Sequence, residues 1–114
     1  MSERINPNIR LKERLEMAIK ITVLKRRLYK DLVDQYAADK DFAQCPKYQD
    51  GQEFILDTKD MPVGFCSWAW ADIHRDVVAI FHGANFPWIE RKSMILSCCT
   101  DGLRPVVFKI EKIG

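Results

Sequence analysis

Two segments near opposite ends of the chain alternate apolar and polar side chains, which is the pattern of a strand with one buried face. The first is AIKITVLK at residues 18–25, and the second is VVFKIE at residues 106–111. Both are rich in β-branched residues, and each needs a cover for its apolar face. The two strands could therefore pair in one sheet, although most of the sequence lies between them.

Three shorter elements are predicted between these strands. Asp31 is suited to cap a short helix over residues 32–38. A second strand is expected over residues 52–56 and a third over residues 94–99. Asp101-Gly102 is a typical two-residue turn and predicts a hairpin that joins the third strand to the last one.

The longest predicted helix follows residues 62–64, whose proline and glycine disfavour a helix. Its apolar residues recur at the i, i+4, i+7 spacing of one helix face, and this stripe consists of Cys66, Trp70, Ile73, Val77 and Ile80. Gly83 suits the left-handed conformation that ends a helix. Cys66 should then stand at the helix N-terminus, where unpaired backbone N–H groups and the helix dipole stabilise negative charge.

The elements run in the order strand, helix, strand, helix, strand, strand. The chain has 114 residues, enough for one domain with a modest core. We predict an α+β domain over residues 18–114, built on a mainly antiparallel sheet with the long helix packed on one face. Residues 1–17 are predicted to form a helical appendage that docks on the domain or pairs with a second copy in a homo-oligomer.

Charge is unevenly distributed along the chain. Residues 1–30 hold nine Lys or Arg and three Glu, whereas residues 31–76 hold four Lys or Arg and ten Asp or Glu. The basic part has no aromatic residue before Tyr29 on which a base could stack, so no nucleic-acid partner is expected. No apolar run has membrane-spanning length and the first residues lack a signal-peptide core, so we expect a cytoplasmic protein without a membrane partner.

Side chains suited to chemistry are concentrated in two segments, GFCSWAWAD at residues 64–72 and CCTDGLRP at residues 98–105. If the hairpin folds back beside the start of the long helix, the two segments form one site. The candidate site residues are a thiol, two indoles, two carboxylates and a guanidinium: Cys66, Trp68, Trp70, Asp72, Asp101 and Arg104.

The four cysteines lie at positions 45, 66, 98 and 99 and include no Cys-x-x-Cys pair, which is the usual zinc spacing. Neighbouring strand residues point to opposite faces, so Cys98 and Cys99 cannot both face one ion unless a bulge intervenes. A three-thiolate zinc or iron site would combine Cys45, Cys66 and one of that pair with a fourth ligand, such as water or a histidine. In a reducing compartment the same thiols are also suited to redox chemistry.

Which of Cys98 and Cys99 faces the site is left open by the sequence. A two-residue turn at Asp101-Gly102 sets Cys99 opposite Arg104 and puts it on the inner face. Leu96 argues instead that the face of Cys98 is buried.

Each candidate also has a plainer interpretation. Cys66 would be a small buried apolar residue. The tryptophans would belong to the core rather than to a ligand pocket. Asp72 would lie on a solvated helix face, and Arg104 would form a salt bridge with Asp72 or Asp101 instead of binding an anion.

Several motifs resemble a small family of uncharacterised microbial proteins. The shared blocks are Cys45-Pro46, the segment 64–72, Asn85-Phe86-Pro87-Trp88 and the segment 98–106. The resemblance covers the chain from about Ile19 onward and leaves the N-terminal appendage out. It implies that the cysteine blocks belong together, and it carries over no catalytic role because the family has no known activity.

Three functions from different classes remain. The first is a cysteine-centred site, built from Cys45, Cys66 and Cys98 or Cys99, that binds a metal or performs thiol redox chemistry. The second is a small binding module whose aromatic pocket takes a small molecule or a partner chain. The third is an accessory subunit with inert core cysteines. The sequence does not decide whether the protein is an enzyme.

Overall fold

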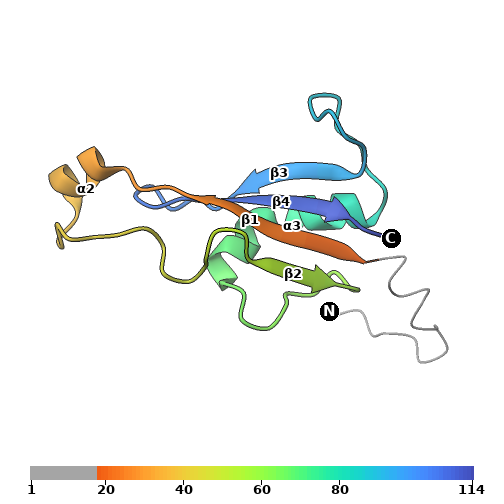
Figure 1. Ribbon diagram of the computed structural model, residues 1–114, viewed down its shortest axis with the longest axis horizontal. Helices are drawn as coiled ribbons and strands as arrows, with labels where there is room; N and C mark the ends of the chain where they lie inside the picture. The colour runs from red at the N-terminus through yellow and green to blue at the C-terminus, as the bar shows by residue number, and fades with distance from the viewer. Residues whose placement is uncertain (1–17) are drawn as a thin grey trace.

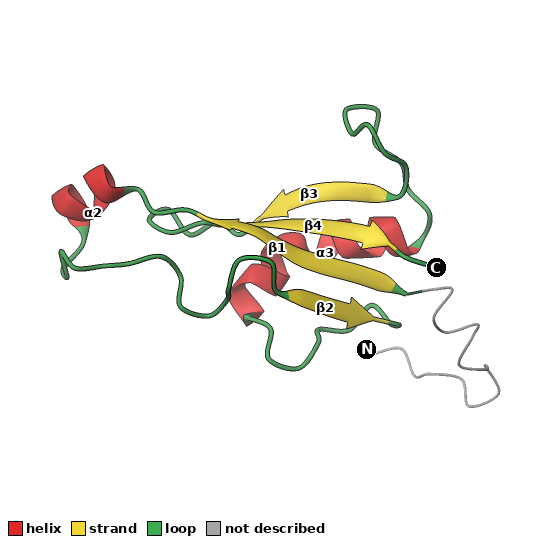
Figure 2. Ribbon diagram, viewed as in Figure 1, coloured by secondary structure: helices red, strands yellow, loops and turns green. Residues whose placement is uncertain are grey.

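Residues 18–114 form an α+β domain in the computed structural model, which describes this part of the chain. Six elements follow one another: β1 (Ile19–Arg26), α2 (Lys30–Tyr36), β2 (Glu53–Leu56), α3 (Ser67–Phe81), β3 (Met94–Cys98) and β4 (Val106–Lys112). The four strands form one antiparallel sheet, α3 lies against one face of it, and α2 lies beyond the end of β1 (Figures 1 and 2). The predicted α+β class is confirmed, whereas the predicted helical appendage at residues 1–17 lies outside the described residues.

The sheet has the strand order β2-β1-β4-β3, so the first and last strands form its centre. The pairing of these two strands, which their alternation allowed, is observed. Ile21 of β1 lies opposite Phe54 of β2 and Ile110 of β4, and Ile110 lies opposite Ile95 of β3. Because directly opposed residues share a face, these apolar side chains form a row across one face of the sheet.

Helix α3 covers this apolar face. Its N-cap is Cys66, which has the extended backbone (φ −74, ψ 125) usual for that position. Gly83 follows the helix with φ +85, a conformation that a side chain would strain. The fully buried part of the predicted stripe is Ile73, Val77 and Ile80. Burying one such side chain stabilises the fold by roughly 1.5–3 kcal/mol. None of the helices in the described part of the chain is long and apolar enough to cross a membrane.

The predicted cap of the short helix is wrong. Helix α2 begins at Lys30 with Tyr29 as N-cap, so Asp31 lies in the first helical turn. A carboxylate at that position still stabilises the helix through the dipole. Asp31 therefore does lie at the N-terminal end of this helix, but the N-cap is two residues earlier than predicted.

The predicted two-residue turn between β3 and β4 is also wrong. Ser97 lies opposite Phe108 and Cys98 opposite Val107, so residues 99–105 connect the strands. The pairing differs from the predicted one by two residues, which leaves every side chain on its predicted face. Leu96 is 47% exposed, so it lies on the sheet face that α3 leaves uncovered.

Candidate functional site

Cys45, Cys66 and Cys99 line a single cavity of about 790 Å³, which we term the thiol cavity. Its walls come from residues 45–48, from the start of α3 and from the connection between β3 and β4. All three cysteines are half-buried against the hydrophobic core, and none is in a disulfide. Thiols from three separate segments of the chain therefore line one space.

Cys66 occupies the open N-terminal end of α3. Its backbone N–H donates to the hydroxyl of Tyr48 at 3.0 Å, and its carbonyl accepts the N–H of Trp70 at 2.9 Å. Its side chain makes no capping hydrogen bond. The backbone of Cys66 is thus fixed, while its thiol is left for other contacts at the helix end where negative charge is stabilised.

Tyr48 is a residue of the thiol cavity that the sequence did not indicate. Its ring packs against Phe65 and Phe108, with centroid distances of 5.4 and 5.3 Å, and the residue is only 2% exposed. Burial is the largest cause that raises the pKa of Tyr48, and negative charge on the three nearby cysteines raises it further; the hydrogen bond from Cys66 opposes both. The hydroxyl therefore stays protonated well beyond neutral pH. Its contact with Cys66 joins residues 18 positions apart, a relation that local sequence patterns do not reveal.

The two adjacent cysteines have different surroundings. Cys99 donates its N–H to the carbonyl of Val106 at 3.0 Å, and its sulfur accepts the N–H of Val106 at 3.2 Å. Cys98 is exposed and does not line the thiol cavity; its thiol donates to the carbonyl of Cys99 at 3.1 Å. The pKa of Cys98 is raised mainly by partial burial, and to a smaller extent by the negative charges of Cys99 and Asp72. Of the two adjacent cysteines, between which the sequence did not decide, Cys99 is the one that lines the thiol cavity.

Asp72 holds the connection between β3 and β4 against α3. Its Oδ2 accepts the N–H of Thr100 at 2.8 Å, and both carboxylate oxygens accept the hydroxyl of Thr100, at 3.1 and 3.0 Å. These contacts are exposed to solvent, so Asp72 lies at the surface of α3 and also binds the connection. Because Thr100 directly follows Cys99, this contact also positions Cys99.

Asp101 organises the rest of the connection. Its Oδ1 accepts the N–H groups of Leu103 and Arg104 at 2.9 and 3.1 Å, and its Oδ2 accepts Nε of Arg104 at 3.2 Å. Burial would raise the pKa of Asp101, but these three hydrogen bonds and the guanidinium charge together hold it below its ordinary value. Of the two salt bridges considered for Arg104, the one to Asp101 is observed.

The tryptophans do not form a common pocket. Trp68 lines the thiol cavity and is 84% exposed, so its indole stands at the rim. Trp70 is half-buried, packs on Phe65 at a centroid distance of 5.6 Å, and does not line the thiol cavity. Trp88 lies in the loop before β3 and is 71% exposed. Among the candidate site residues, Trp70 is the one that the fold leaves outside the cavity.

The arrangement of the thiols does not favour a zinc or iron site. Across residues 18–114, no group of three or more His, Cys, Asp or Glu side chains lies close enough together to hold a metal ion. Cys45, Cys66 and Cys99 therefore share a cavity without converging on one point.

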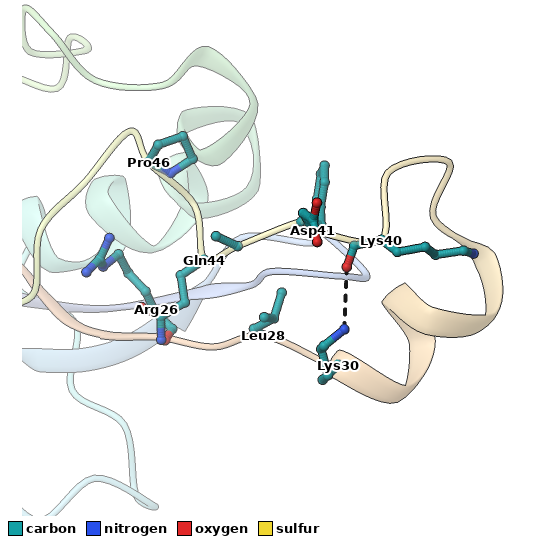
Figure 3. Close-up of a pocket in the computed structure, with 9 residues that line it drawn as sticks. Arg26, Leu28, Lys30, Lys40, Asp41, Gln44 and Pro46 are labelled. Carbon is teal, nitrogen blue, oxygen red and sulfur yellow. Dashed lines mark hydrogen bonds between the residues drawn. The ribbon is translucent and has the colours of Figure 1, made fainter.

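A second hollow of about 600 Å³ lies between the end of β1, the start of α2 and residues 40–46 (Figure 3). Lys30 Nζ donates to the carbonyl of Lys40 across it at 3.4 Å, as the dashed line shows. Arg26 also lines it and donates to the carbonyl of Cys45 at 3.2 Å. None of the candidate site residues lines this hollow, so the chemistry of the thiols belongs to the thiol cavity.

Comparisons with known proteins were made at the level of family, sequence and structure. A scan against protein-family models, a search of curated proteins and a search of solved structures each found no match. The resemblance of the cysteine motifs to a microbial family stays a prediction. A function for this chain must therefore be argued from the residues of the thiol cavity themselves.

Proposed function

We propose that the thiol cavity is a site of thiol–disulfide exchange, with Cys66 as the attacking thiol and Cys45 as the second thiol. The observation that carries this proposal is that three free thiols line one cavity, one of them at the open end of α3. The thiolate is the attacking form of cysteine, and a helix N-terminus stabilises a negative charge placed there. Such exchange fits the cytoplasm, where thiols are kept reduced.

The choice of Cys45 as the second thiol follows from how the other two cysteines are held. Cys99 is held by Val106 through both its N–H and its sulfur, so moving its sulfur costs the hydrogen bond from the N–H of Val106. Cys45 lies outside every helix and strand of the domain. Its sulfur can therefore approach Cys66 by a change in one loop.

The exchange proceeds in two balanced steps. The Cys66 thiolate attacks one sulfur of a substrate disulfide; a bond forms between the two sulfurs, the substrate bond breaks, and the leaving thiolate takes up the proton that Cys66 released. Cys45, having lost its proton, then attacks the Cys66 sulfur and releases the second half of the substrate, which takes up that proton. The substrate disulfide is reduced to two thiols, and Cys45 and Cys66 are oxidised to one disulfide.

An uncharged disulfide reagent, dithiodipyridine, tests this order of events because each released thiopyridone can be followed by absorbance. We expect a fast phase that releases two thiopyridones per protein and leaves a Cys45–Cys66 disulfide detectable by mass spectrometry. Cys66→Ser should abolish the fast phase. Cys45→Ser should stop it at one thiopyridone, with the reagent still attached to Cys66.

Cys98→Ser is the matched control, because Cys98 is exposed and lies outside the thiol cavity. It should keep the fast phase and lose only the slower reaction of an isolated surface thiol. The proposal is overturned if Cys66 stays unmodified until the protein is denatured, or if the fast phase survives in Cys66→Ser.

A binding module is the second candidate, and it is favoured by the exposure of Trp68 at the rim of the cavity. An indole exposed at a cavity mouth is a common anchor for a partner or ligand. In this case Trp68→Ala should abolish binding of the partner, and Cys66→Ser should leave that binding intact.

A further inference from the structure

Arg104 is held in one orientation beside the thiol cavity, which it helps to line. Its Nε donates to Asp101 at 3.2 Å, and its guanidinium carbon lies 4.3 Å from the ring centroid of Phe42. A guanidinium stacked on an aromatic face and fixed by a carboxylate loses little further freedom when it binds a ligand.

Within residues 18–114, the outer nitrogens of this guanidinium have no protein partner. In the chain from residue 18 onward, Asp101 is the sole acceptor for Arg104, and it is reached through Nε. The Arg104 side chain is 30% exposed, so it is open to a ligand yet partly removed from water. Two N–H groups in a fixed fork match the two oxygens of a carboxylate or phosphate.

The negative charges that line the cavity are already engaged by the protein. Asp101 accepts three hydrogen bonds from the connection between β3 and β4, and Asp72 is occupied by Thr100. Lys47 adds a second positive charge to the lining. The formal charges of the lining therefore balance, and what favours an anion at Arg104 is that its outer N–H groups, within residues 18–114, still have hydrogen bonds to donate while both carboxylates already accept them.

We propose that Arg104 binds an oxyanion of the substrate, so that the thiol cavity selects small disulfides that carry a carboxylate. This inference rests on the proposed thiol–disulfide exchange. A cavity of about 790 Å³ has the size of a small-molecule site. The anionic group binds at Arg104 while the disulfide reaches Cys66, since both residues line the same cavity.

The test compares two disulfide reagents of similar size in Cys98→Ser protein: dithiobis(nitrobenzoate), which carries two carboxylates, and the uncharged dithiodipyridine. Arg104→Gln should slow the reaction of the carboxylate reagent with Cys66 about tenfold, as expected for the loss of one charge-assisted hydrogen-bonded pair. The reaction with the uncharged reagent should be unchanged. Arg104→Lys keeps the charge but not the fork and should give an intermediate rate.

Arg75→Gln is the charge-matched control, since Arg75 is a highly exposed residue of α3 outside the thiol cavity. It should leave both rates unchanged. Equal slowing of both reagents by Arg104→Gln would overturn the inference and make Arg104 a structural residue. No slowing of either reagent would overturn it as well. If neither reagent modifies Cys66 in the Cys98→Ser protein, the exchange function itself fails, which is a separate outcome.

Discussion

Tyr48 connects the aromatic core to the thiol cavity. Its ring is buried between core side chains, and its hydroxyl holds the backbone of Cys66, the N-cap of α3. A buried phenol resists ionisation, because the charged form would lose its hydration. Tyr48 should therefore contribute to the pH dependence of the domain's stability.

Tyr48→Phe tests that dependence. As pH rises past the ordinary tyrosine pKa of 10.0, the unfolded chain loses this proton before the folded protein does, because the folded-state pKa is raised. This contribution to stability is full below that value and declines above it, by at most about 1.4 kcal/mol per pH unit. The variant lacks this decline, and at neutral pH it is less stable by about 1 kcal/mol through the lost hydrogen bond.

Urea unfolding at about pH 8 and about pH 11 measures both effects. The difference in unfolding free energy between wild type and Tyr48→Phe should shrink or reverse at the higher pH. Tyr29→Phe, at an exposed tyrosine, is the control and should show no such change. An equal difference at both pH values would contradict the role given to burial.

For single residues, the sequence predicted burial where helix periodicity determines which face of the helix a side chain occupies. Trp68 and Trp70 are two positions apart, so their side chains point to nearly opposite sides of α3, and the apolar stripe contains only Trp70. The observed burial of the two indoles agrees with this. Tyr48, by contrast, owes its place to a contact across the fold, and local spacing carries no information about such contacts.

At the scale of elements, the connection between β3 and β4 shows how far turn chemistry can be predicted. Asp101-Gly102 correctly predicted a reversal of the chain, but the side chain of Asp101 caps the two residues that follow Gly102 and so widens the turn. Asp72 then binds Thr100 from α3. The length of the connection depends on these side-chain contacts, and a dipeptide signal does not include them.

Asp72→Ala tests the contact between α3 and this connection. It removes the acceptor for the N–H and the hydroxyl of Thr100, so we expect the unfolding free energy to fall by about 1 kcal/mol at this exposed position. The fast reaction of Cys66 with an uncharged disulfide should persist, since Cys66 is held by Tyr48.

A double-mutant cycle with Thr100→Val, followed by urea unfolding, isolates the pair. Both single variants should have a lower unfolding free energy than wild type. The loss in the double variant should be smaller than the sum of the two single losses. Strict additivity would mean that the contact between Asp72 and Thr100 does not stabilise the fold.

At the scale of the whole molecule, the architecture was predictable because strand alternation and helix periodicity both act along the chain. β1, α3 and β4 carry these patterns over seven residues or more, and their positions agree with the predicted ones to within about two residues, the usual uncertainty of element ends. The short helix α2 has few residues and one buried side chain, Val33, so its start depended on a single cap signal. The cavity is formed by two loops and the start of α3, and strand and helix patterns do not predict how these three parts meet.

Removal of residues 1–17 tests whether residues 18–114 are sufficient for the fold. We expect a chain that begins at Ala18 to keep its circular dichroism spectrum and to unfold within a few degrees of the full chain, because the four strands and α3 supply the apolar face and its cover. Thermal unfolding followed by circular dichroism measures this. An insoluble or unfolded product would show that the first residues complete the core or an interface.

The pairing of β1 with β4 sets a condition on how the protein is made. Ile21 and Ile110 lie opposite each other, yet most of the chain separates them. A ribosome adds about 5–20 residues per second, so β1 leaves it several seconds before its partner exists. During that time the apolar side of β1 lacks its central neighbour, and closing so long a loop is slow even when the chain is complete. We therefore expect the apolar side of β1 to be a binding site for chaperones until β4 emerges.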